Sequence, residues 1–289
     1  MTILIFGRDG QLGSCLVNKL NQEKINYVAF SKKEVDITNN DLVKFIIKKN
    51  KPTTVINAAA YTLVKESENN KKKAFDVNQY GVKNIAVACK NADCNLIHIS
   101  TDYVFDGTSC KPYTPEMNTN PINVYGKSKL KGEHELIKHG GKFIILRTSW
   151  VFSEYGKNFV KTMIQIANKK RNINVVNDQT GTPTYAGDIS EVILNLNTKF
   201  DDDKVQEIYH YAGSPLCTWY DFAKTLFQIL LEKKLISKMP ILIPTPSSDY
   251  YDGLKRPTYS ALCSKKYIQE FNVCETDWRD SLKNITVKL

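Results

Sequence analysis

Short apolar runs alternate with longer amphipathic stretches along the first half of the chain. Apolar runs at 2–6, 26–30, 53–60 and 95–100 are separated by helical patterns at 14–24, 39–51 and 72–92. Strands that alternate with helices of this length are typical of a parallel sheet with helices on both faces. The pattern therefore predicts a doubly wound α/β fold.

The second half of the chain is less regular. A loop rich in Pro, Gly and Thr at 106–121 leads into a helical pattern that stops at the glycines 140–141, and an apolar strand follows at 142–152. Beyond it we expect a polar loop at 177–189 feeding a helix, a strand at 207–213, an amphipathic helix at 218–235 and a mostly extended segment at 239–267. We predict one domain at 1–150 and a smaller, partly interwoven C-terminal lobe at 151–289. A strand and a helix near 186–212 are expected to return to the first domain.

Composition and charge narrow the class of protein. The 289 residues are 42% hydrophobic and 24% charged, as in ordinary globular proteins. The net charge of +10 comes from scattered lysines without a nucleic-acid-binding motif, so nucleic acid is not an expected partner. No apolar run is long enough to cross a bilayer and no signal-peptide pattern opens the chain, so we expect a cytoplasmic protein. The seven cysteines lack paired spacing, which predicts reduced thiols and no metal site.

Three glycines follow the first predicted strand. Gly7, Gly10 and Gly13 form G-x-x-G-x-x-G immediately before the first helical pattern. Glycines allow a tight turn and let a pyrophosphate approach the amides at a helix N-terminus. This context predicts a Rossmann-type dinucleotide-binding domain.

The residues after the second predicted strand bear on the choice of cofactor. An acid that would bind a ribose 2′-hydroxyl is not found at the strand end, where Ser31, Lys32 and Lys33 stand instead. A serine followed by lysines would accept a 2′-phosphate, and Arg8 could reach the same group. These residues favour NADPH, with NADH as the alternative. If Lys32 and Lys33 are only part of the solvated surface, they indicate no preference between the two cofactors.

A tyrosine and a lysine four positions apart are the candidate catalytic residues. Tyr125 and Lys129 share one face of a predicted helix. A lysine ammonium beside a tyrosine would lower the pKa of the phenol, which could then give a proton to a carbonyl oxygen as hydride arrives. Ser100, Thr101 and Asp102 end an earlier strand, where a hydroxyl could bind the developing alkoxide. Together these residues predict a hydride-transfer enzyme.

The ordered motifs resemble a known family. The stretches FGRDGQLG (6–13), VINAAAYT (55–62), STDYVFDG (100–107), YGKSKLKGE (125–133), NDQTGTPTYAGDI (177–189) and RPTYSAL (256–262) are similar to those of the extended short-chain dehydrogenase/reductases, and within them the dTDP-4-dehydrorhamnose reductase family. The resemblance implies reduction of the 4-keto group of dTDP-4-dehydro-6-deoxy-L-mannose to dTDP-L-rhamnose, a precursor of surface polysaccharide.

The resemblance also implies roles for individual residues. Tyr125 would donate the proton, Thr101 would bind the keto oxygen, and Lys129 would hold the nicotinamide ribose. The cofactor contacts, including those proposed from the glycine turn and the second strand, would be Gly7, Gly10, Gln11, Leu12, Gly13, Ser31, Lys32, Asp36, Ile37, Ala60, Tyr61, Thr62, Tyr125 and Lys129. The substrate contacts would be Thr101, Asp102, Tyr103, Trp150 and Arg256.

Two other functions fit the same motifs. One is a sister reductase that makes a different deoxysugar, and the other is a non-catalytic regulatory subunit like the β subunit of methionine adenosyltransferase. Lys65 and Ser67 depart from the acid and the alanine that the family pattern has after the third strand, where they affect expected substrate contacts. The expected partners are a nucleotide-sugar and a second copy of the chain, since the family is often dimeric.

Overall fold

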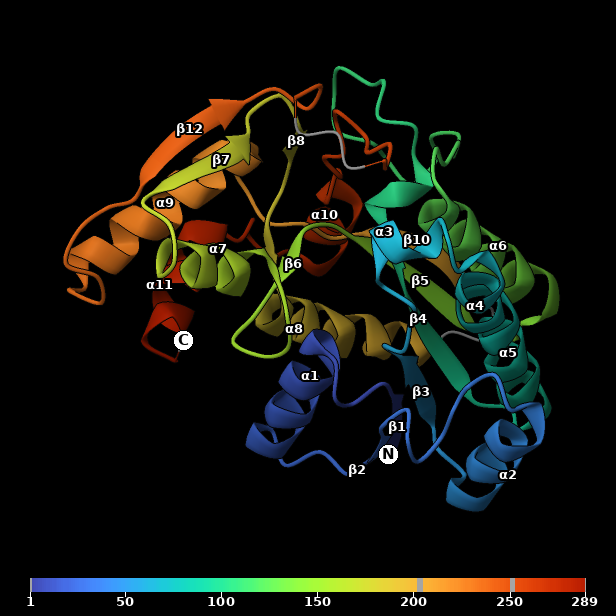
Figure 1. Ribbon diagram of the computed structural model, residues 1–289. Helices are drawn as coiled ribbons and strands as arrows, with labels where there is room; N and C mark the ends of the chain where they lie inside the picture. Colours follow the sequence, from blue (N-terminus) through green and yellow to red (C-terminus); the bar gives the residue numbers. More distant parts are fainter. Residues whose placement is uncertain (1, 202–204, 250–252, 289) are drawn as a thin grey trace.

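A six-stranded parallel sheet forms the centre of the protein, seen in a computed structural model that describes residues 2–201, 205–249 and 253–288 (Figure 1). The strand order is β10-β5-β4-β3-β1-β2. The strands are β1 (Ile3–Phe6), β2 (Tyr27–Phe30), β3 (Thr54–Asn57), β4 (Asn95–Thr101), β5 (Phe143–Thr148) and β10 (Gln206–His210). The chain runs outward from β1 to β2 and then crosses to β3 on the other side of β1. Such a reversal opens a crevice at the carboxyl ends of the strands, where ligands bind in this class of fold.

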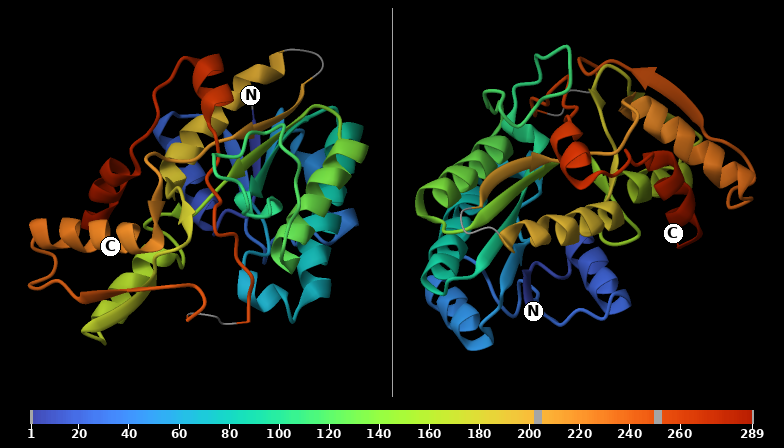
Figure 2. Two further views of the ribbon diagram at one scale, coloured as in Figure 1. Left: turned by 90° about the horizontal axis from the view of Figure 1, so that it is seen from above. Right: turned by 180° about the vertical axis from the view of Figure 1, so that it is seen from behind.

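Helices cover both faces of this sheet, as predicted. Helices α1 (Gln11–Gln22) and α8 (Ala186–Asn197) pack their apolar side chains on one face. Helices α2 (Asn40–Asn50), α5 (Val82–Asn91) and α6 (Val124–His139) cover the other face. Figure 2 shows the same two layers from above and from behind. Each central strand is buried on both sides, which explains its nearly continuous apolar sequence.

Local sequence signals set the helix ends. The Asn39 side chain accepts a hydrogen bond from Leu42 N and caps α2, and Asn123 caps α6 through Gly126 N. The predicted stop at the glycines is confirmed, because α6 ends at His139 with Gly140 following. An asparagine oxygen satisfies amides that the first helical turn leaves without partners. The start of α6 is therefore fixed by its own sequence.

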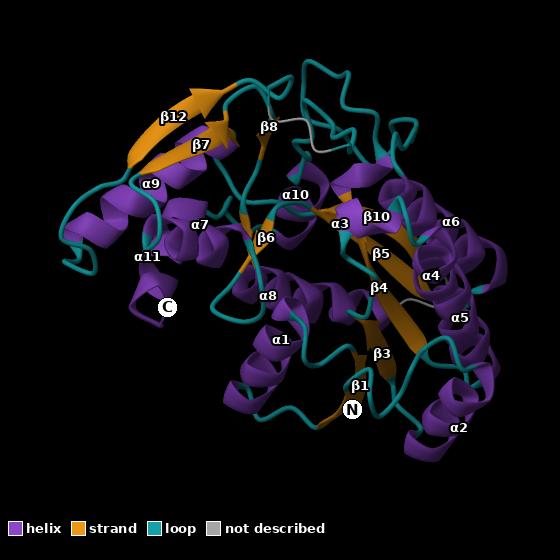
Figure 3. Ribbon diagram, viewed as in Figure 1, coloured by secondary structure: helices purple, strands orange, loops and turns teal. Residues whose placement is uncertain are grey.

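A smaller lobe stands beside the sheet. It contains α7 (Phe159–Ala167), β7 (Asn172–Val176), α9 (Trp219–Glu232), β12 (Ile241–Thr245) and α11 (Trp278–Ile285), which enclose a separate apolar core. Strands β7 and β12 pair in parallel as a two-stranded ribbon, drawn apart from the central sheet in Figure 3. The ribbon lies within segments for which the sequence indicated no regular element.

The two halves of the chain are interwoven. Strand β10 pairs with β5 at the edge of the main sheet, and α8 packs against α1. Tyr267 of α10 (Lys265–Phe271) also enters the apolar cluster of that face. Strand β10 and helix α8 thus pack with the main sheet, while the division of the chain into domains at residue 150 stays a prediction.

Shorter elements connect these layers. They are α3 (Val64–Ser67), α4 (Lys71–Phe75), the π-helix η1 (Asp76–Gly81), η2 (Asp102–Val104), β6 (Val151–Phe152), β8 (Thr180–Gly181), β9 (Thr184–Tyr185), η3 (Thr198–Asp201), β11 (Cys217–Thr218) and η4 (Thr286–Lys288). Within the described ranges, no helix combines the length and apolar character that a membrane span requires.

Two sequence-based element predictions were wrong in detail. The strand expected at 142–152 breaks, because Trp150 adopts a left-handed φ of 46° and β6 then leaves the sheet to pair with β9. The helix expected at 72–92 is present without a break from Lys71 to Asn91, but its middle turn, η1, is a π-helix between α4 and α5. Trp150 lines the cavity at the carboxyl end of β5, and η1 contacts the loop after β3 through Asn78.

Candidate active site

The glycine turn has the shape that a bound pyrophosphate needs. Gly7 has a φ of +90°, and a Cβ there would lie 2.7 Å from the backbone nitrogen of Ala59. A Cβ on Gly13 would lie 2.1 Å from the Gly7 oxygen, so α1 can approach the turn only without a side chain. Gly10 is the N-cap of α1. The turn and helix N-terminus therefore fit an anionic dinucleotide.

A cavity of about 410 Å³ lies in front of this turn, at the carboxyl ends of β3, β4 and β5. Helix α6 forms another of its walls. The predicted site residues that line it are Gly10, Gln11, Leu12, Ala60, Thr62, Thr101, Asp102, Tyr103, Tyr125, Lys129 and Trp150. The fold thus brings the glycine turn, the strand-end hydroxyl and the Tyr/Lys pair to one place.

Close packing positions Tyr125 beside the end of β4. A Cβ on Gly126 would lie 2.1 Å from the backbone oxygen of Tyr103, so the first turn of α6 rests directly on η2. Glu68 also accepts a hydrogen bond of 2.8 Å from Val124 N. The Tyr103 and Tyr125 rings meet edge to face with centroids 5.5 Å apart. These contacts hold the phenol of Tyr125 toward the cavity.

Burial sets the pKa values of Tyr125 and Asp102. It raises the pKa of Tyr125 to about 12, and a hydrogen bond with Thr101 opposes the rise. Burial also raises the pKa of Asp102 to about 6, against hydrogen bonds from Ser260 and Thr101. The lowering of the Tyr125 pKa that we expected from Lys129 is not seen, because burial dominates and the Asp102 charge also raises the pKa. Tyr125 is held as the protonated acid.

Lys129 is almost fully buried, at 2% exposure. Its Nζ donates to the Ile99 oxygen at 2.6 Å and lies 3.5 Å from His98 Nε2. Burial lowers the pKa of Lys129 to about 8, although the negative charge of Glu133 acts in the opposite direction. The ammonium is therefore close to its titration range at the pH of a cell.

Asn57 orients His98 behind Lys129. Ala59 N must donate, so the Asn57 atom 3.1 Å from it is Oδ1, and Nδ2 faces His98 Nδ1 at 3.1 Å. Because His98 Nδ1 accepts from Asn57 Nδ2, the proton of neutral His98 lies on Nε2, toward Lys129. Burial and the Lys129 charge lower the pKa of His98 well below its ordinary value. The sequence alone does not indicate this pair, because His98 lies in an apolar strand and only the fold places it beside the lysine.

A second buried network supports the end of β4. Arg147 Nε and Nη2 donate to the two oxygens of Glu133 at 3.0 and 2.7 Å, and Ser100 Oγ donates to the same carboxylate.

The Thr148 hydroxyl at the end of β5 is buried, lines the cavity and meets no hydrogen-bond partner within the described part of the chain. Thr148 can therefore serve a bound ligand. Its position at the end of a parallel strand is the only signal that the sequence offered.

The π-helix η1 fixes the loop after β3. Asn78 accepts from Tyr61 N at 2.8 Å and donates to Tyr61 O at 3.0 Å and to Ser128 Oγ at 2.9 Å. The extra residue of a π-turn aims this buried side chain between the loop and α6. The positions of Ala60 and Thr62 in the cavity wall thus depend on Asn78.

A larger cavity of about 650 Å³ adjoins the first one, and Tyr103 lines both. Its walls come from the loop after β4 and from the smaller lobe, and they include Arg256, Lys255 and Trp219. Trp150 stacks on Trp219 with ring centroids 3.5 Å apart, which joins the end of β5 to α9. This second cavity is contiguous with the first and carries two basic side chains, Lys255 and Arg256, beside the acid Asp106.

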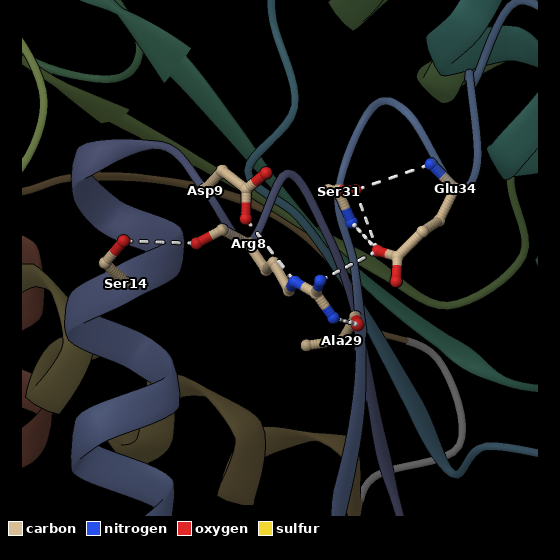
Figure 4. Close-up of polar contacts among 6 residues, drawn as sticks. All are labelled: Arg8, Asp9, Ser14, Ala29, Ser31 and Glu34. Carbon is tan, nitrogen blue, oxygen red and sulfur yellow. Dashed lines mark hydrogen bonds and ion pairs between the residues drawn. The ribbon is translucent and has the colours of Figure 1, made fainter.

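An acid, Glu34, lies beside the end of β2, where we predicted that a 2′-phosphate would bind. Ser31 is buried, and its N and Oγ donate to Glu34 at 2.8 and 2.7 Å, while Arg8 pairs with Glu34 at 3.2 Å (Figure 4). Lys32 Nζ lies 3.9 Å from Asp36 on the surface. Glu34 lies three residues after Ser31, and a tight turn brings its carboxylate back to the strand terminus.

Other predicted cofactor residues lie outside the first cavity. Ile37 is buried in the core against Gly81. The predicted residues that do not line this cavity are Gly7, Gly13, Ser31, Lys32, Asp36, Ile37 and Tyr61. Gly7 and Gly13 shape the turn as described, and the direct contacts of the remaining residues with a cofactor stay predictions.

Comparison with known proteins agrees with this geometry. The family model "RmlD substrate binding domain" matches residues 1–289. A dTDP-4-dehydrorhamnose reductase of Aggregatibacter actinomycetemcomitans is 41% identical over 286 residues, which cover 98% of this chain and 97% of the relative. The chain belongs to the dTDP-4-dehydrorhamnose reductase family. An Escherichia coli K12 member is 33% identical over 294 residues, with 100% and 98% of the two chains covered.

Solved structures of the dTDP-4-dehydrorhamnose reductase family have the same architecture. The Clostridium acetobutylicum protein superposes with a TM-score of 0.91 at 33% identity, covering 99% of both chains. The Bacillus anthracis protein, solved in complex with NADP, gives a TM-score of 0.88 at 33% identity, again covering 99% of both chains. The Rossmann-type fold is thus confirmed.

Proposed function

We propose that this chain reduces the 4-keto group of dTDP-4-dehydro-6-deoxy-L-mannose to give dTDP-L-rhamnose, with NADPH as the cofactor and NADH as an alternative. The observation that carries the proposal is the meeting of Thr101, Tyr125 and Lys129 in one cavity beside the glycine turn. The named relatives and the NADP complex of the Bacillus anthracis protein support the same substrate and cofactor.

The residues of the chain divide the chemistry among them. The reduced nicotinamide supplies the hydride that reaches the keto carbon. Tyr125, protonated because burial raises its pKa to about 12, gives its proton to the keto oxygen. The Thr101 hydroxyl binds that oxygen as negative charge develops, and Lys129 offers donors to the cofactor ribose. Arg256 and Lys255 line the second cavity, where they would bind the diphosphate of the nucleotide-sugar.

The experiment that tests the proposal follows NADPH oxidation with the dTDP-4-keto sugar. In Tyr125→Phe we expect kcat to fall by about 10²- to 10⁴-fold because the proton donor is gone, with NADPH affinity within about twofold of wild type. The exposed Tyr80→Phe serves as the matched control and should keep full activity. Undiminished turnover in Tyr125→Phe would remove the phenol from the mechanism.

The same reaction separates the alternatives. A Streptomyces niveus relative named dTDP-4-keto-6-deoxy-D-glucose reductase is 34% identical over 263 residues, so a sister product has specific support. NMR of the product sugar distinguishes the C4 configurations. Turnover by the purified chain alone would exclude a purely regulatory subunit.

We also propose that the protein acts in the cytoplasm and as a homodimer. The seven cysteines are free thiols, which suits the reducing cytoplasm. A homodimer is expected from the resemblance, and sedimentation of the purified chain would test it.

A further inference from the structure

One carboxylate oxygen gathers the polar groups at the end of β2. Glu34 Oε2 accepts from the backbone nitrogen of Ser31 at 2.8 Å and from its hydroxyl at 2.7 Å. The same oxygen lies 3.2 Å from Nη2 of Arg8. Arg8 is also anchored, because its Nη1 donates to the Ala29 oxygen at 3.1 Å. Figure 4 shows Glu34 turned back over the strand end toward the guanidinium.

The position of this cluster relates it to the dinucleotide site. Gly7 N and Arg8 N both donate to the Phe30 oxygen, at 2.9 and 3.1 Å, which ties the glycine turn to the end of β2. In a doubly wound sheet the residue after the second strand faces the adenosine ribose of a dinucleotide. The three side chains therefore stand where the 2′ substituent of that ribose would arrive.

The donors that Glu34 collects are those that a phosphate takes. A serine hydroxyl, a backbone amide and an arginine guanidinium are common partners of phosphate oxygens. The 2′-phosphate of NADPH would meet these donors and a negative charge together. The 2′-hydroxyl of NADH would instead find in the carboxylate an acceptor for its proton.

Glu34 can leave this position without uncovering the core. The side chains of Arg8 and Glu34 are 42% and 44% exposed, so both reach solvent. Asp9 also approaches Arg8, with 3.4 Å between its Oδ1 and Nε, but its side chain is 70% exposed. Lys32 pairs with Asp36, also on the surface. Glu34 is thus the acid among these that binds Arg8 and the buried Ser31 at once.

We propose that Glu34 is a specificity-determining residue that occupies the 2′-phosphate subsite. Its carboxylate competes with NADPH for Arg8 and Ser31 and accepts the 2′-hydroxyl of NADH. The inference rests on the proposed function, because it requires a dinucleotide in the crevice. It makes the wild-type protein a weak discriminator between the two cofactors.

Glu34→Gln tests the proposal, since it removes the charge and keeps the size. Dissociation constants for NADPH and NADH are measured by calorimetry at fixed ionic strength, with adenosine 2′,5′-bisphosphate and 5′-AMP as probes of the subsite alone. We expect the ratio of the NADH constant to the NADPH constant to rise about tenfold, mainly through tighter NADPH binding. The bisphosphate should gain affinity over 5′-AMP by a similar factor.

Two other variants control the measurement. Glu191→Gln removes an exposed carboxylate that pairs with Lys19 in α1, and should leave every constant unchanged. Arg8→Gln should lower the NADPH affinity and leave that for NADH within about twofold. Tight binding of both cofactors with an unchanged ratio in Glu34→Gln would overturn this inference alone. Failure of the folded wild-type protein to bind either cofactor would overturn the proposed function together with it.

Discussion

At the scale of single residues, the site combines groups whose burial opposes their charge. Lys129 and Asp102 are both almost inaccessible to solvent, and each lines the first cavity. Burying a charged group in such a place costs folding free energy. Proteins keep such a group mainly where it serves a ligand. Their titration therefore reports on function and on stability.

Lys129 predicts the alkaline limit of activity. Burial lowers its pKa to about 8, so the ammonium is present below that pH and is lost above it. We expect kcat for the reduction to be level below about pH 8 and to fall at higher pH, measured with both substrates saturating. Lys127→Met, on the exposed face of the same helix, should leave the profile unchanged. A level profile up to pH 10 would contradict this assignment.

Asp102 predicts a conflict between stability and function. Burial raises its folded pKa to about 6 from an ordinary 3.8, so its contribution to stability is full below pH 3.8 and is lost as pH rises through 6. At pH 7.5 the ionised group costs about 3 kcal/mol of unfolding free energy. Asp102→Asn should therefore raise the melting temperature by several degrees at pH 7.5 and lower the substrate affinity.

Asp106 provides a control of opposite sign. Hydrogen bonds from Thr108 and Tyr113 outweigh burial and hold the pKa of Asp106 below its usual value. Its stabilisation is present at neutral pH and is lost in acid, so Asp106→Asn should lower the melting temperature at pH 7.5. Equal effects of the two substitutions would show that their ionisation does not decide the outcome.

At the scale of elements, the π-helix η1 is what positions the loop after β3. Asn78→Ala would leave the backbone N–H and C=O of Tyr61 without their partner in a buried place. We expect a loss of about 1–3 kcal/mol in unfolding free energy and weaker cofactor binding, measured by denaturation and calorimetry. Gln79→Ala, the next residue of the same turn, breaks only a bond to Glu135 and should change neither measurement appreciably.

At the scale of the whole molecule, the two halves of the chain complete one another. Strand β10 forms an edge of the main sheet, and α8 supplies Ile189, Val192, Ile193 and Leu196 to the cluster against α1. Gln11 in the glycine turn also binds the smaller lobe, accepting at Oε1 from Ser153 and Asn158. The second half of the chain therefore completes the main core, and the smaller lobe contacts the glycine-turn side of the site.

This arrangement predicts how fragments of the chain behave. A fragment of residues 1–150 lacks α8 and β10, so it exposes one face of α1 and one edge of β5. We expect it to be largely unfolded or aggregated by circular dichroism, whereas a fragment of 1–212 should retain substantially more structure. Cooperative thermal unfolding of the 1–150 fragment would instead establish the boundary at residue 150.

What the sequence determined by itself follows from local physics. The period of the apolar residues fixed the parallel sheet, glycines at 7 and 13 fixed the turn, and the asparagine caps fixed where α2 and α6 begin. The spacing of Tyr125 and Lys129 placed both on one helix face. Each of these depends on residues close together in the chain, and a single sequence contains that information.

The tertiary structure alone decided the surroundings of these groups. The rise rather than fall of the Tyr125 pKa, the His98 ring behind Lys129 and the Glu34 carboxylate on Arg8 all depend on burial and on segments brought together by folding. Desolvation is a property of the whole packed interior, and no window of the sequence carries it. The sequence predicted the candidate reacting side chains, and the fold set their charge.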